Sequence, residues 1–207
     1  MSEPLRTIAV FDFDGTLTRR DTLPLFIKHT HGRVRYLLGL IICLPWIVAY
    51  KLGLYNNGKA KEHLFAHFYK GMDYDIFRNM GETFSEKIET WQNKPVINIL
   101  KDHKKHGHKI YVVSASLEEW VLPWCNKHGV DYVLATKAMV DCNNKLTGQF
   151  LTQNCYGTEK VRRFKEVEPM RNEYELYVYG DSRGDWKLME FADHPVYVGQ
   201  LPVNKDE

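Results

Sequence analysis

The stretch Ile8–Leu17, IAVFDFDGTL, decides the expected fold. Its first four residues are all apolar, which is typical of a strand buried on both faces of a sheet. Two carboxylates, Asp12 and Asp14, follow at once, and their burial costs free energy unless a cation or hydrogen bonds compensate. Because ligand sites of open α/β sheets lie at strand ends, the stretch predicts either such a site or an ordinary Asp–Gly turn.

Later apolar runs in the chain also end at polar residues. Ser114 ends one such run, and Asp181 follows another after a single glycine. Strand and helix patterns alternate through the second half of the chain, which predicts a parallel sheet covered by helices on both faces. Since the carboxyl ends of parallel strands share one edge, we expect these groups to meet Asp12, which favours a functional site over a turn.

Between the first two predicted strands lies a long region with helical signals only. Asp21, Asn57 and Asp73 are placed as helix caps, and apolar residues recur there at helical spacing. We therefore expect an all-helical cap, residues 21–93, inserted into an α/β core formed by residues 1–20 and 94–207.

Length and composition narrow the class of protein. The 207 residues suffice for one domain with an inserted cap, and 44% hydrophobic and 26% charged residues are ordinary for a folded soluble protein. A net charge of +2, from 28 basic and 26 acidic residues, argues against a nucleic-acid partner. Four widely spaced cysteines and an N-terminus without a secretory pattern predict a cytoplasmic location.

One stretch of the predicted cap, Tyr36–Tyr50, contains no charged residue over 15 positions and is flanked by Arg33, Arg35 and Lys51. It is shorter than the about 20 residues of a spanning helix, and Pro45 is expected to break it. Two interpretations stay open. The stretch is either a buried helical hairpin or an interfacial segment that would place the protein at the inner face of a membrane, with the basic flanks at the headgroups.

The motifs together resemble the haloacid dehalogenase (HAD) superfamily of phosphatases. DFDGTLT at residues 12–18 is similar to the first family motif, and SAS at residues 114–116 is similar to the second. CYGTEK at 155–160 and GDSRGD at 180–185 are similar to the later ones. The resemblance spans nearly the whole chain and implies a Rossmann-like parallel sheet with a helical cap. The position of the cap is similar to that in subfamily IB, the phosphoserine phosphatase-like branch.

This resemblance implies hydrolysis of a phosphomonoester through an aspartyl-phosphate intermediate. Asp12 would be the nucleophile, and Asp14 would act as general acid and then as general base. Ser114, Ala115 and Lys160 would bind the phosphate and balance its charge. On composition alone Lys160 would be an exposed helix lysine, and its place in the CYGTEK motif is what points to the site.

The same resemblance implies a Mg²⁺ cofactor, since a hard dication suits a cluster of carboxylate and phosphate oxygens. Asp12, Asp14 and Asp181 are the expected metal ligands, with Asp14 contributing its backbone carbonyl. Asp185 would act through water or from behind the ligands.

The substrate is the least readable part of the function. Asp21 stands where phosphoserine phosphatases carry an acidic residue that helps to hold the substrate amine, but it fits equally as a helix cap. The apolar stretch of the cap instead resembles the phosphatidylglycerophosphatase C type, whose substrate is a phospholipid phosphate at the membrane. A phosphoserine-like metabolite and a lipid phosphate are therefore both candidates. A phosphotransferase and a non-catalytic binding module are the alternative functions.

Three histidines, His103, His106 and His108, lie outside these motifs among lysines. The run is predicted to be a solvated helix end, whose cations suit the helix dipole, rather than a metal site.

Overall fold

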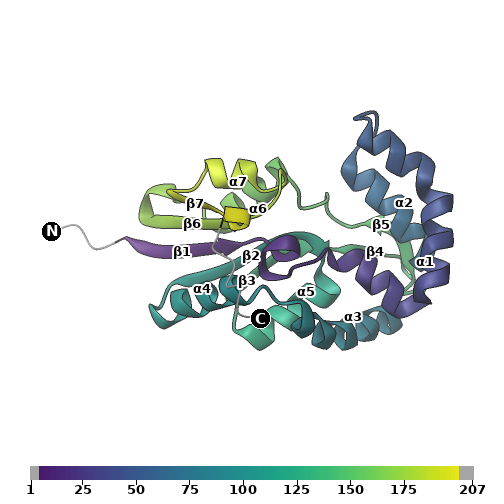
Figure 1. Cartoon of the computed structure of the whole chain (residues 1–207), viewed down its shortest axis with the longest axis horizontal. Coiled ribbons are helices and arrows are strands. Elements are labelled where there is room, and N and C mark those ends of the chain that lie inside the picture. The colour runs from purple at the N-terminus through teal and green to yellow at the C-terminus, as the bar shows by residue number, and fades with distance from the viewer. Residues whose placement is uncertain (1–4, 201–207) are drawn as a thin grey trace.

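The computed structural model describes residues 5–200, and its centre is a sheet of five parallel strands (Figure 1). The strand order is β3–β2–β1–β6–β7, so the first strand lies in the middle. Residues Ile8 to Phe11 of this strand are fully buried, as their uninterrupted apolar run predicts. The strands are β1 (Arg6–Phe11), β2 (Lys109–Leu117), β3 (Tyr132–Thr136), β6 (Tyr174–Gly180) and β7 (His194–Tyr197).

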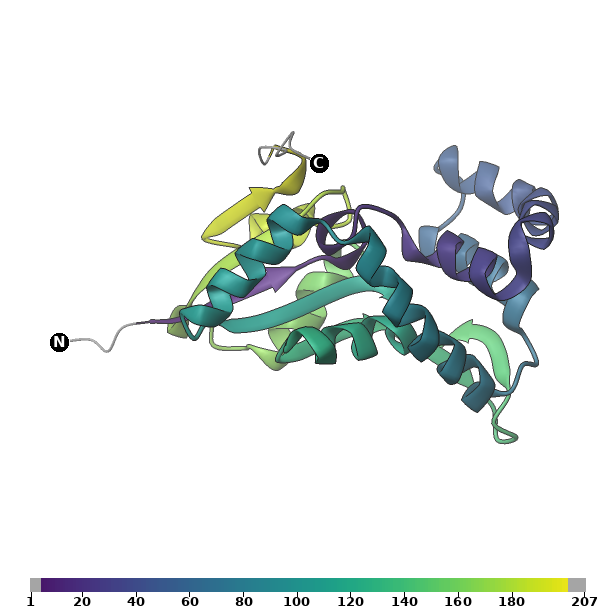
Figure 2. The ribbon, with the colours of Figure 1, turned by 60° about the horizontal axis from the view of Figure 1, so that its bottom comes forward.

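Helices cover both faces of the sheet (Figure 2). The helices of one face are α4 (Lys94–Lys105) and α5 (Glu118–His128), and those of the other are α6 (Thr158–Val167) and α7 (Trp186–Glu190). Alternate residues of β1 point to the two faces. Phe11 joins the core under α4 and α5, whereas Val10 packs with Phe164 of α6 and Leu188 of α7. The predicted α/β class with a parallel sheet is confirmed.

The residues between β1 and β2 fold into three further helices. They are α1 (Thr22–Lys51), α2 (Asn57–Tyr69) and α3 (Tyr74–Ile88). α1 and α2 lie beyond the carboxyl ends of the strands, at the end of the molecule opposite the N-terminus (Figure 1). Asp21 and Asp73 cap α1 and α3 as predicted, and the cap of α2 is Asn56 rather than Asn57.

α1 differs from the prediction in where it bends and in what it buries. It continues through Pro45 and bends instead at Gly32, whose φ of +81° is readily accessible to glycine. Within Tyr36–Tyr50 only Gly39 and Cys43 are buried. The interpretation of this stretch as a buried hairpin is therefore wrong, because it is one helix with a single covered side. Among the described residues, α1 is the helix long and apolar enough to cross a membrane by length and composition.

A small antiparallel hairpin between β3 and α6 leaves the sheet and packs on α2. Its strands are β4 (Ala138–Val140) and β5 (Leu146–Phe150). The N–H of Gly71, just after α2, donates a hydrogen bond of 2.7 Å to the carbonyl of Leu146. The N–H of Phe150 donates one of 2.9 Å to Glu62 Oε1 on α2. The hairpin is therefore attached to α2 at both ends of β5.

The histidine run at the C-terminal end of α4 is only partly solvated. His103 is buried, and its Nε2 lies 2.9 Å from the hydroxyl oxygen of Tyr179 on β6. Its Nδ1 lies 2.7 Å from Nδ1 of His108. Burial lowers the pKa of His103 to about 4, so this residue is a neutral core histidine and the predicted solvated helix end is wrong at this position.

Candidate active site

A cleft of about 670 Å³ opens at the carboxyl ends of β1, β2 and β6, where the sheet faces α1 and α2. This is the edge at which open α/β sheets place their ligands. Asp185 is buried and does not line the cleft. The other site residues predicted from the sequence all line it: Asp12, Asp14, Asp21, Ser114, Ala115, Lys160 and Asp181.

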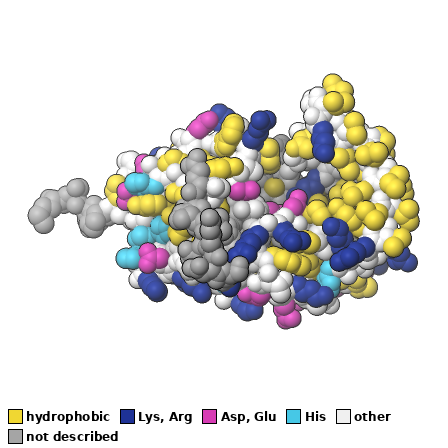
Figure 3. Space-filling model, viewed as in Figure 1, with side chains coloured by type: hydrophobic (Ala, Val, Ile, Leu, Met, Phe, Trp, Pro, Cys, Tyr) yellow, Lys and Arg dark blue, Asp and Glu magenta, His cyan; other side chains and the backbone are white. Residues whose placement is uncertain are grey.

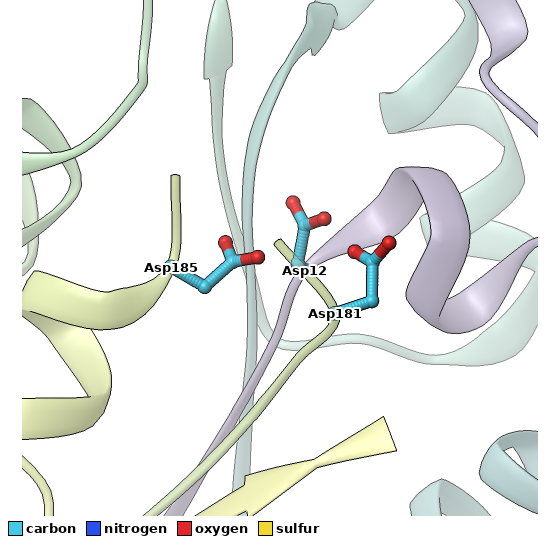
Figure 4. Close-up of side chains that lie close together, drawn as sticks. All are labelled: Asp12, Asp181 and Asp185. Atoms are coloured by element: carbon cyan, nitrogen blue, oxygen red, sulfur yellow. The ribbon is translucent and has the colours of Figure 1, made fainter. Parts of the chain in front are cut away.

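Three carboxylates, which follow β1, follow β6 and precede α7, point toward one another at the base of the cleft (Figure 4). One oxygen each from Asp12, Asp181 and Asp185 lies within 4.8 Å of the other two. Buried carboxylates at such separations repel one another, so the cluster needs compensating cations. Because a set of carboxylate oxygens is what hard dications prefer, the residues present fit Mg²⁺. Asp14 does not belong to this cluster, and both of its side-chain oxygens accept hydrogen bonds from other residues.

Lys160 supplies one compensating cation within the protein. Its Nζ lies 2.6 Å from Asp12 Oδ1 and 2.6 Å from Asp185 Oδ1, and it donates a 2.8 Å hydrogen bond to the carbonyl of Val113. Burial alone would lower the pKa of Lys160, but the two carboxylates outweigh burial and raise it. Burial raises the pKa of Asp12 to about 7, and the Lys160 ammonium opposes that rise. Lys160 is therefore a buried bridge between two acids and not a surface lysine.

The turn after β1 needs glycine at one position. Gly15 has a φ of +79°, and a Cβ there would lie 2.1 Å from Asp181 Oδ2. The next residue, Thr16, donates a hydrogen bond of 3.3 Å from its hydroxyl to Asp181 Oδ1. The Gly–Thr pair of the first motif therefore positions a carboxylate that comes from β6.

Asp14 is held by a chain of hydrogen bonds that reaches into α5. Its Oδ1 accepts a 3.1 Å hydrogen bond from the N–H of Thr22, and its Oδ2 accepts one from the hydroxyl of Ser116. The Ser116 and Thr22 hydroxyl oxygens lie 3.0 Å apart, and Trp120 Nε1 donates a 2.9 Å hydrogen bond to the Thr22 hydroxyl. An ionised carboxylate can only accept, so Ser116 gives its one proton to Asp14, Thr22 donates to Ser116, and the Thr22 oxygen accepts from Trp120.

Sequence reasoning missed Thr22, Ser116 and Trp120. Ser116 lies within β2, which continues to Leu117, and α5 begins without a side-chain cap. The available signal was the second serine of the SAS motif, two residues after Ser114. Burial raises the pKa of Asp14 to about 6, with the Asp21 charge adding to the rise and the Ser116 hydrogen bond opposing it.

The remaining predicted residues lie on the walls of the cleft. Asp21 accepts a 3.1 Å hydrogen bond from the N–H two residues later and so caps α1. Ser114 is buried, and its hydroxyl oxygen accepts a 3.0 Å hydrogen bond from the N–H two residues later. Lys61 of α2 donates a 2.8 Å hydrogen bond to the carbonyl of Ala115. A lysine thus connects α2 directly to the backbone that follows Ser114.

A family model described as haloacid dehalogenase-like hydrolase matches residues 9–190. This chain belongs to that family. It is 30% identical over 197 residues to the protein CicA of Caulobacter vibrioides, with 94% of this chain and 86% of that protein covered. It is 20% identical over 220 residues to a histidinol-phosphatase of Neisseria meningitidis serogroup C, with 94% of this chain and 90% of that protein covered.

Solved structures share the fold of this HAD chain. A Bordetella pertussis protein described as having unknown function matches with a TM-score of 0.78 at 21% identity, covering 94% of this chain and 90% of its own. A substrate-bound phosphoserine phosphatase matches with a TM-score of 0.64 at 18% identity, covering 94% and 87%. The predicted family, the HAD fold and the class of enzyme, an HAD-type phosphatase, are confirmed.

Proposed function

We propose that this HAD enzyme hydrolyses a phosphomonoester in two steps through an aspartyl-phosphate on Asp12. The observation that carries the proposal is the position of Lys160. Its ammonium lies between the carboxylate of Asp12, at the end of β1, and that of Asp185. A buried ammonium at 2.6 Å favours the ionised form of the Asp12 carboxylate and fixes its orientation toward the cleft that it lines.

In the first step a carboxylate oxygen of Asp12 attacks phosphorus, and the bond from phosphorus to the ester oxygen breaks. Asp14 donates its proton to the departing alkoxide. In the second step Asp14, now ionised, accepts a proton from a water molecule that attacks phosphorus. The bond between phosphorus and Asp12 then breaks, and inorganic phosphate leaves.

The other residues bind charge and shape the site. Ser114 and the N–H of Ala115 would hold a phosphoryl oxygen, beside the Lys160 ammonium. Mg²⁺, held by Asp12, Asp181 and the backbone carbonyl of Asp14, with Asp185 behind them, would neutralise charge on the phosphoryl oxygens. Residues 21–93 would form the cap that excludes water from the core formed by residues 1–20 and 94–207.

The proposed substrate is a phosphoserine-like small metabolite or a lipid phosphate. The carboxylate of Asp21 on the wall of the cleft would suit a substrate amine. A lipid phosphate such as phosphatidylglycerophosphate is the second candidate, and one observation favours it: Ile47 and Tyr50 of the apolar helix α1 line the same cleft. In that case the protein would act from the cytoplasm at the inner face of the membrane. Transfer to an acceptor alcohol instead of water would use the same intermediate.

The test is phosphate release from phosphoserine, other small phosphomonoesters and phosphatidylglycerophosphate in mixed micelles, with and without Mg²⁺. We expect Mg²⁺-dependent release from at least one of them, and no release by a folded Asp12→Asn variant. A fully active Asp12→Asn enzyme would refute the nucleophile. If the wild-type protein releases phosphate from none of the substrates, a non-catalytic module is favoured. A phosphorylated acceptor alcohol among the products would favour a phosphotransferase.

A further inference from the structure

One side of α1 is covered by exposed apolar side chains, and Figure 3 shows hydrophobic side chains gathered over the end of the molecule formed by α1 and α2. Beyond Gly32 the helix turns by about 100° per residue, so these side chains fall within one sector of about 160°. The members that are more than half exposed, called the apolar face of α1 below, are Val34, Leu37, Leu38, Ile41, Ile42 and Leu44.

The opposite side of α1 is closed by α2. A Cβ on Gly39 would lie 2.2 Å from the ring of Phe68, and Cys43 is buried with its Sγ near the carbonyl of His63. This contact fixes which side of α1 faces outward. The apolar face is therefore a constant feature of the folded chain and not the result of a loosely attached helix.

Basic residues border the apolar face on both edges. In projection down the helix axis Arg33 and Lys51 fall at one edge and Arg35 at the other. The sequence from Thr22 to Lys61 holds six Lys or Arg residues and no Asp or Glu. An apolar strip between two basic edges is complementary to a surface that is apolar inside and anionic at its rim.

We propose that the apolar face of α1 docks on the anionic surface of a phospholipid bilayer, with the helix lying in the plane of the headgroups. The straight segment from Val34 to Tyr50 is about 25 Å long at 1.5 Å per residue, less than the about 30 Å of a hydrocarbon core. Its other side is held by α2, so the helix lies on the bilayer and does not cross it. A second copy of the chain on the same face would bring like basic edges together, which opposes that pairing.

Docking places the catalytic cleft beside the headgroups. Ile47 and Tyr50, on the inner side of the same helix, line the cleft that holds the carboxylate cluster. α1 is then the wall between bilayer and cleft. The docking surface does not depend on the phosphatase chemistry proposed above, and the experiment measures vesicle binding and phosphatase activity separately.

The experiment is sedimentation of the full-length protein with vesicles of phosphatidylcholine alone or mixed with phosphatidylglycerol. We expect binding to the mixed vesicles, weaker binding at high salt, and little binding to phosphatidylcholine alone. Ile41→Glu should lower the partition coefficient at least about tenfold, since an apolar side chain leaves the interface and a carboxylate enters it. Ile76→Glu, an equally drastic change at an exposed position of α3, should bind like the wild type.

The hydrolysis of p-nitrophenyl phosphate without vesicles should be unchanged in Ile41→Glu, because Ile41 does not line the cleft. Wild-type protein that stays in the supernatant with anionic vesicles overturns the proposal, and so does Ile41→Glu that binds like the wild type. A wild-type dimer in solution that Ile41→Glu converts to a monomer, without vesicle binding, assigns the face to a second copy and also overturns it. If the wild-type protein does not hydrolyse p-nitrophenyl phosphate, that result would count against the proposed reaction and not against docking.

Discussion

The indole N–H of Trp120 donates a hydrogen bond of 2.9 Å to the hydroxyl of Thr22. Trp120 belongs to α5 of the core, whereas Thr22 is the first residue of α1. Because an ionised Asp14 can only accept, Ser116 donates to Asp14 and Thr22 donates to Ser116. The proton that Asp14 gives to a leaving group must then be bound at a carboxylate lone pair that accepts no hydrogen bond from Thr22 or Ser116.

Trp120→Phe should therefore impair the general acid. Without the indole N–H the Thr22 hydroxyl loses one of its hydrogen-bond partners, so the hydrogen bonds that orient Asp14 are held less firmly. We expect kcat/KM for an alkyl phosphate to fall about tenfold, because an alkoxide leaves poorly without a proton, and that for p-nitrophenyl phosphate to fall less than about threefold. The ratio of the two kcat/KM values is the measurement.

Trp124→Phe is the matched control for this change. Trp124 lies one turn further along α5 and is buried, and its Nε1 has no hydrogen-bond partner among the described residues. Its replacement should destabilise the protein without altering the ratio. If Trp120→Phe slows both esters equally, the hydrogen-bond chain does not position the acid.

Lys160→Met should lower kcat by about 10²- to 10³-fold, since it removes the ammonium between Asp12 and Asp185. The remaining carboxylates then depend on a metal ion for compensation. Mg²⁺ should accordingly raise the Tm of the variant more than that of the wild type. Lys165→Met, an exposed change on the same helix, should leave both quantities as they are.

Gly15→Ala should weaken the metal site. The new Cβ would lie 2.1 Å from Asp181 Oδ2 and must displace that carboxylate. We expect the Mg²⁺ concentration for half-maximal activity to rise about 10- to 100-fold. Gly71→Ala is the matched control. Gly71 has a similar φ, +82°, but no atom lies within 4 Å of an added Cβ, so this variant introduces the backbone strain without the steric clash. An unchanged Mg²⁺ requirement in Gly15→Ala would argue against Asp181 as a ligand.

His103 should make stability fall in acid. Its pKa is about 4 in the folded protein, below the ordinary value of 6.5, so the unfolded chain binds more protons between these values. The contribution of His103 to the free energy of unfolding is present in full above pH 6.5 and is lost as the pH falls toward 4. The loss should be on the order of 2 kcal/mol and should largely disappear in His103→Gln. Urea unfolding across this pH range measures it, and equal pH dependence in both proteins would contradict it.

The sheet and the convergence of the site could be predicted from the sequence, because they rest on local patterns. An uninterrupted apolar run marked β1 as a central strand, and parallel strands place their ends at one edge. Asp12, Ser114 and Asp181 consequently meet where the patterns indicated. The alternation of strand and helix patterns was sufficient to predict that these residues converge, although it contains no information on how the side chains pack.

Other features depend on contacts between distant segments and were not readable. The sequence from Tyr36 to Tyr50 is apolar on all sides, so composition could not tell which side α2 covers. The roles of Ser116 and Trp120 arise only when β2 and α5 meet the start of α1. His103 is polar in sequence and buried in the fold because Tyr179, 76 residues later, supplies its partner.

The attachment of the β4–β5 hairpin to α2 limits how the helices between β1 and β2 could be exchanged for those of another protein. Transplanting residues 21–93 alone would strip the hairpin of the partners that Glu62 and Gly71 provide. It would also leave Gly148, whose missing Cβ lets Ala66 approach, against an unmatched helix. A folded chimera would therefore have to move residues 138–150 together with the helices, although these two segments are separated in the sequence by the whole of β2, α5 and β3.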